Sequence, residues 1–90
     1  MKVQIHIQDI AETVEAPDAS GILRRVKGEA ARRAPFLLRG VINGMGDLGF
    51  AAEAVKRANK SKGRQDAIPQ SAQEFLDWAV AQGYATFVEP

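Results

Sequence analysis

The sequence predicts one small α+β domain, in which a short sheet is covered on one face by about four helices in the order β-β-α-α-α-α-β. Two observations carry this prediction. Apolar and polar residues alternate at the start of the chain, as in a strand with one buried face, and from residue 18 onward apolar residues recur at helical spacing. Ninety residues make up one domain, residues 1–90, and the absence of cysteine excludes disulfides and thiolate metal sites.

The first element is a strand over residues 2–8, because Val3, Ile5 and Ile7 fall on one face and polar residues on the other. The alternation resumes more weakly over residues 13–16 and stops at Pro17. A β-hairpin is the simplest arrangement that accounts for both segments.

A first helix is predicted from a cap at Asp18 to about Arg33. Gly21 and Gly28 each weaken this helix by roughly 1 kcal/mol relative to alanine, so packing has to hold it. Its apolar stripe consists of Ile22, Val26, Ala30 and Ala34.

Pro35 suits the first turn of a second helix, in which apolar residues from Leu37 to Met45 keep a helical period. Gly44 and Gly46 end that helix, and Asp47 is predicted to cap a third one. The predicted inner face of the third helix consists of Leu48, Ala51, Ala52, Val55 and Ala58, and residues 60–66 are predicted to form a polar loop.

Ser71 and Glu74 have the spacing of a capping box and predict a fourth helix. Phe75, Leu76, Ala79 and Val80 form its expected buried face. Gly83 suits its C-terminal cap, and residues 84–88 follow as a short last strand.

The glycines at positions 44, 46 and 49 match the G-x-G-x-x-G pattern of dinucleotide-binding folds. That pattern requires a preceding strand, whereas the segment before Gly44 has helical spacing, so we interpret it as a turn between two helices. The only histidine, His6, lacks the partners of a triad or a zinc site. We therefore expect no catalytic residue, no metal site, no cofactor and no small-molecule substrate.

Charge is distributed unevenly along the chain. Residues 24–64 carry eleven cations and three carboxylates, a net charge of +8, whereas residues 1–23 carry −3 and residues 65–90 carry −4. On helices, cations that lie off the apolar stripes can form one positive surface that follows phosphates. The candidate residues are Arg24, Arg25, Arg32, Arg33, Arg39, Lys56, Arg57, Lys60, Lys62 and Arg64.

From this asymmetry we predict a non-catalytic binding or regulatory domain that presents a basic helical surface to an anionic partner, with DNA or RNA slightly favoured. The alternative is a protein-interaction module or homodimer that uses Trp78, Tyr84 and an exposed edge strand, the basic residues being only solubilising. Trp78 also suits the edge of a small core. Because neither a signal peptide nor a membrane span is evident, we expect a cytoplasmic protein without membrane contact.

Overall fold

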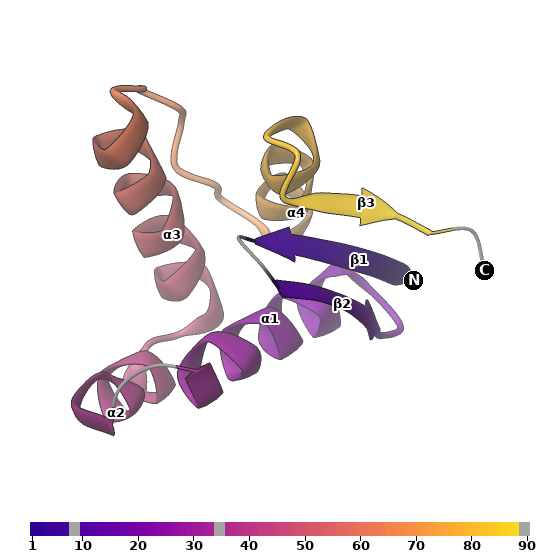
Figure 1. Cartoon of the computed structure of the whole chain (residues 1–90), viewed down its shortest axis with the longest axis horizontal. Coiled ribbons are helices and arrows are strands. Elements are labelled where there is room, and N and C mark those ends of the chain that lie inside the picture. Colours follow the sequence, from indigo (N-terminus) through magenta and orange to yellow (C-terminus); the bar gives the residue numbers. More distant parts are fainter. Residues whose placement is uncertain (8–9, 34–35, 89–90) are drawn as a thin grey trace.

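A computed structural model describes residues 1–7, 10–33 and 36–88, and it has the predicted order β-β-α-α-α-α-β (Figure 1). Its three strands and four helices form one compact body with a radius of gyration of 12.5 Å. The elements are β1 (Lys2–Ile7), β2 (Ile10–Glu15), α1 (Ala19–Arg33), α2 (Phe36–Gly44), α3 (Asp47–Lys62), α4 (Ala72–Ala81) and β3 (Ala85–Phe87).

The sheet is antiparallel throughout and has the strand order β2-β1-β3, so the N-terminal strand is central. Val3 pairs with Val14 on one side and with Phe87 on the other. Val3 is completely buried and Val14 nearly so, as the alternation predicts for the inner face. The last strand, β3, lies within the predicted residues 84–88, and backbone hydrogen bonds to β1 continue at both of its ends: the N–H of His6 donates to the carbonyl of Tyr84, and the N–H of Val88 donates to the carbonyl of Lys2.

Helix α1 begins after Asp18, whose Oδ1 accepts a hydrogen bond from the backbone N–H of Gly21 at 2.9 Å. The predicted cap and the predicted end at Arg33 are both confirmed. Gly21 has a packing reason as well, because a Cβ built there would lie 2.7 Å from the Cβ of Ala16. No such constraint applies to Gly28, which has open space around it.

Helices α2 and α3 are joined by a tight turn at Met45 and Gly46, which confirms that the glycine motif separates two helices. Three details of α3 differ from the prediction. Gly46, not Asp47, is its N-cap, since the Asp47 carboxylate is engaged with cations of α1. Leu48, expected inside, is 45% exposed because it lies in the first turn of α3, before the part of the helix in which Ala51 and Val55 are completely buried. The helix also continues to Lys62 and ends at Gly63, which has a left-handed φ of 64°.

Helix α4 begins as predicted, with the backbone N–H of Glu74 donating to the Ser71 hydroxyl at 3.1 Å. The Glu74 carboxylate accepts from the backbone N–H of Gln70, one residue before the position that a standard capping box uses. Gly83 follows the helix with a φ of 82°, the left-handed conformation expected of it.

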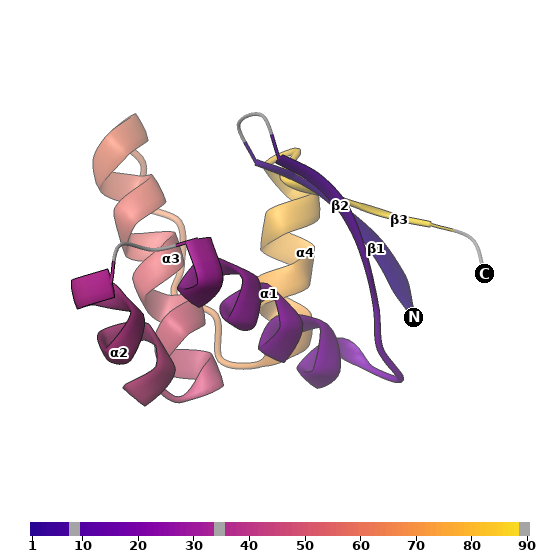
Figure 2. The same cartoon turned by 60° about the horizontal axis from the view of Figure 1, so that its bottom comes forward.

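All four helices lie on one side of the sheet (Figure 2), where α1 packs against β2 and α4 packs against β3. Helix α3 contacts α1 and α4, and its C-terminal half extends away from the sheet (Figure 1). Among the described residues, the largest side chains that are fully buried are those of Ile22, Leu23, Leu76, Val3 and Val55. Among the described residues, no helix is both long and apolar enough to span a membrane.

Candidate functional site: an apolar groove with a basic wall

The divergence of α3 from the sheet leaves a groove of about 760 Å³ between α3, α4, α1 and the β1–β2 hairpin. Such a volume lies within the range of ligand sites, roughly 300–1,000 Å³. The apolar side chains that line it come from every surrounding element, and they include Ile5, Val26, Phe50, Ala54, Phe75 and Trp78. We refer to this feature as the α3 groove.

Four aromatic rings contact one another in sequence along the α3 groove. The ring centroids of Phe50 and Phe75 are 6.5 Å apart, those of Phe75 and Trp78 are 5.9 Å apart, and those of Trp78 and Tyr84 are 5.6 Å apart. These separations are typical of favourable aromatic pairs. Because Phe75 is buried while the other three are only partly buried, the cluster links the core to the surface of the groove.

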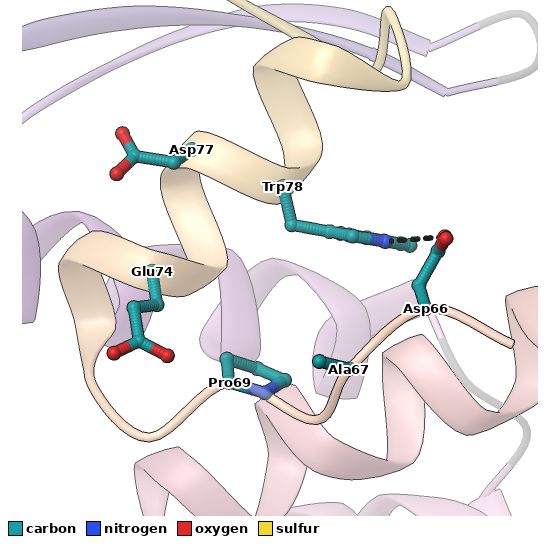
Figure 3. A pocket seen from close by; sticks show the side chains of 6 residues that line it. All are labelled: Asp66, Ala67, Pro69, Glu74, Asp77 and Trp78. Atoms are coloured by element: carbon teal, nitrogen blue, oxygen red, sulfur yellow. Dashed lines mark hydrogen bonds between the residues drawn. The ribbon is translucent and has the colours of Figure 1, made fainter.

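Trp78 is fixed at its polar end. Its indole Nε1 donates to Oδ2 of Asp66 at 3.0 Å (Figure 3), and the same carboxylate lies 3.4 Å from Nε of Arg64. Asn59 holds this loop against α3 by donating to the carbonyl of Asp66 and accepting from its N–H. The tryptophan therefore sits at the edge of the core, as predicted, in an orientation set by the loop after α3.

A smaller pocket beside α4 is lined by three acidic residues, Asp66, Glu74 and Asp77, but in Figure 3 the Asp77 carboxylate points away from Pro69 and the Asp66 carboxylate is turned toward the indole. Each of these acids already serves a local structural contact. Glu74 accepts from the N–H of Gln70, Asp77 accepts from the Gln73 amide at 3.0 Å, and Asp66 holds the indole. Within the described ranges, no group of three or more acidic or histidine side chains is arranged to hold a metal ion.

The cations of α1 are largely engaged by carboxylates. Arg24 and Lys27 reach Asp47 at 3.4 and 3.5 Å, and Lys27 also donates to the carbonyl of Met45, tying α1 to the start of α3. Arg32 donates to both oxygens of Glu29 at 2.5 Å. These bonds hold the pKa of the Glu29 carboxyl below its ordinary value, and they raise the pKa of the Arg32 guanidinium.

Arg33, at the end of α1, contacts two carboxylates. Its guanidinium donates to Glu12 of β2, and its Nε lies 3.7 Å from Glu29. Arg25 is exposed, and it has no ion pair within the described part of the chain. The side chain of Arg39 lies outside the described residues, as does Pro35.

The last seven residues of α3 (56–62) form what we call the basic end, with four cations and no carboxylate. Arg57 is 79% exposed, and its nearest carboxylate, Glu53, is 3.9 Å away. Lys62 places its Nζ 5.1 Å from the centroid of the Tyr84 ring. Lys56 and Lys60 are exposed without an ion pair in residues 1–7, 10–33 and 36–88. Just beyond the helix, Arg64 contacts Asp66 and the amide of Gln82.

The structure thus joins parts of two predicted sites. Arg33, Arg57 and Lys62 from the predicted basic surface line the α3 groove, together with Trp78 and Tyr84 from the predicted protein interface. The other described cations are not among the lining residues: Arg24 pairs with Asp47, and Arg32 pairs with Glu29, a carboxylate that it shares with Arg33.

The groove itself was missed at the level of sequence, although α3 carries a signal for it. Phe50, Ala54 and Ala58 recur every fourth residue beside the buried stripe of Ala51 and Val55. Two neighbouring apolar stripes make the apolar face of α3 wider than one core contact needs.

Comparisons with protein-family models, with curated proteins and with solved structures find no match to this chain.

Proposed function

We propose that the chain is a non-catalytic binding domain that holds an anionic partner against Arg57 and Lys62, the two cations of the basic end that line the α3 groove. The supporting observation is that Arg57 and Lys62 line the α3 groove, while within the described residues the one carboxylate paired with either of them, that of Glu53, lies 3.9 Å from Arg57. An exposed pair at that separation contributes little, about 0–1 kcal/mol. The positive charge of this wall is therefore available to a partner.

Part of this charge has a structural explanation. Cations near the C-terminus of a helix interact favourably with the helix dipole, by about 0.3–1 kcal/mol each. That effect falls off within the last turn, so it accounts for Lys60 and Lys62 better than for Lys56 and Arg57. The aromatic groove beside the cations favours an acidic protein segment as the partner, because phosphates alone would leave the apolar wall uncovered.

Nucleic acid is the second candidate. Lys56 and Lys60 lie one helical turn apart, exposed and off the lining of the α3 groove, and they suit contacts with a phosphate backbone. Such contacts weaken steeply as salt rises, since each neutralised phosphate releases counterions.

The test is a fluorescence-anisotropy titration of labelled polyglutamate, duplex DNA and single-stranded RNA at about 50 and about 200 mM salt. R57E is compared with R25E, which makes the same change in net charge at an exposed position of α1 outside the groove. We expect R57E to weaken polyanion binding about tenfold, which is 1.4 kcal/mol, and R25E to change it less than about twofold.

Saturable binding of DNA or RNA that K56E/K60E abolishes and R57E leaves unchanged would favour the second candidate. The proposal fails if none of the three polyanions binds at low salt, or if R57E and R25E weaken binding equally.

A further inference from the structure

The α3 groove has the form of a trough for a helix. The side chains on its α3 wall are small at Ala54, Ala58 and Ser61, so another backbone can approach α3 closely. Phe75 and Trp78 of α4 and Tyr84 form the opposite, aromatic wall. Between Phe50 and Lys62 the α3 wall is about 18 Å long at 1.5 Å per residue, which matches about three turns of an occupying helix.

The apolar walls call for apolar side chains on the occupant. Trp78 and Tyr84 are only partly buried, and Phe50 at the other end of the trough is partly buried too. Partly buried aromatic clusters bordered by polar residues mark protein-interaction sites. A helix with apolar residues at positions i, i+3 or i+4, and i+7 would place them along this cluster.

The charges at the two edges of the groove are unequal. On the hairpin side, Arg33 is neutralised by Glu12 and Glu29. On the α3 side, the one ion pair that Arg57 or Lys62 makes in the described part of the chain is the 3.9 Å contact of Arg57 with Glu53. An occupant with carboxylates flanking its apolar face would complement this edge, whereas a basic one would be repelled.

We propose that the α3 groove binds an acidic amphipathic helix of a partner protein, with its apolar face on Phe75, Trp78 and Tyr84 and its carboxylates toward Arg57 and Lys62. This inference rests on the proposed function and names the chemistry of the partner at that same wall.

The probe is a labelled 16-residue peptide with leucine at positions 3, 7, 10 and 14 and alanine and glutamate elsewhere. Three control peptides accompany it: one with serine for every leucine, one with lysine for every glutamate, and one with the same composition in scrambled order. Anisotropy of the labelled peptide reports binding, and chemical shifts of the Trp78 indole N–H report its place. We expect the first peptide to bind saturably and each control peptide to bind at least about tenfold more weakly.

Two substitutions block the trough without removing a cation. A58W places an indole on the small-residue wall, and S61W does so from an exposed position that tolerates a large side chain. We expect each of these two substitutions to weaken peptide binding about tenfold or more, and R57E/K62E to weaken it to a similar extent. The control is K56E/K60E, which makes the same change in charge outside the groove and should weaken peptide binding less than about threefold. Circular dichroism confirms that each variant is folded.

The inference is overturned if the amphipathic peptide does not saturate, or if A58W and S61W bind it as the native chain does. If R57E weakens polyglutamate binding but the amphipathic peptide binds no better than its controls, the helical partner is excluded and the proposed function is supported. If no anionic probe binds, both the helical partner and the proposed function are excluded. A sedimentation profile showing a dimer that A58W dissociates would assign the groove to a second copy and also overturn the inference.

Discussion

Two glycines of α1 provide a matched test of the packing between that helix and the segment before it. Alanine at either position raises helix propensity by up to about 1 kcal/mol. At Gly28 nothing lies within 4 Å of the new Cβ, so that gain is realised in full. At Gly21 the new Cβ would meet the Cβ of Ala16 at 2.7 Å, whereas carbon atoms pack best at about 3.5–4.0 Å.

The Cβ of Ala16 is fixed to the backbone, so the clash can be relieved only by moving the chain between β2 and α1. Overpacking of this kind costs about 1–3 kcal/mol. We therefore expect Gly28→Ala to raise the free energy of unfolding by roughly 0.5–1 kcal/mol. The free energy of unfolding of Gly21→Ala should be lower than that of Gly28→Ala by about 1–3 kcal/mol. For a domain of this size, each kcal/mol of difference in unfolding free energy corresponds to a difference of roughly 4–8 °C in Tm.

Equilibrium urea unfolding, followed by the fluorescence of the single tryptophan, measures both variants in one series. The reasoning is refuted if the two alanine variants have the same unfolding free energy within about 0.5 kcal/mol, because the distance between Ala16 and Gly21 would then carry no cost.

Three further predictions use the same unfolding assay. Leu76→Ala, at a side chain only 1% exposed, is expected to cost about 2–5 kcal/mol; a cost below that of Val80→Ala, at a half-buried neighbour, would contradict it. Ser71→Ala removes the acceptor at the start of α4 and is expected to cost about 1 kcal/mol, and Ser71→Asp, which keeps an acceptor, should restore most of it. The pKa of Glu29 is lower in the folded chain because Arg32 donates hydrogen bonds to its carboxylate. The stability that this ionised carboxylate contributes is therefore present at pH values above the unfolded-state pKa, and it is lost as the pH falls through the folded-state pKa. Glu29→Gln should flatten that acid-side slope, and an unchanged slope would exclude the pairing.

Much of the fold follows from local patterns. The alternation of β1, the capping residues Asp18 and Ser71, and Gly83 after α4 each act within a few residues, and the structure confirms them. The errors at α3 have a tertiary origin. Asp47 pairs with Arg24 and Lys27, which precede it by 23 and 20 positions, and Leu48 is exposed although Val55, on the same face of α3, is completely buried.

The site could be predicted only in part. Composition identifies the cations, but which of them a carboxylate engages depends on contacts such as Arg33 with Glu12, formed when the hairpin folds over the end of α1. The groove is likewise a property of packing, since its lining residues come from strands and helices that are far apart in the sequence. The doubled apolar stripe of α3 was the one local clue.

The strand order has a consequence for how the chain reaches its folded state. The hairpin can form from the first fifteen residues, but Val3 and Ile5 gain their second neighbours only when Phe87 and Ala85 arrive. Pairings between such distant segments carry a large loop-closure entropy and slow folding. Until that closure, β1 presents an unsatisfied row of backbone amides and carbonyls to other chains, so deleting residues 85–88 should convert a well-behaved domain into one that self-associates through that open strand.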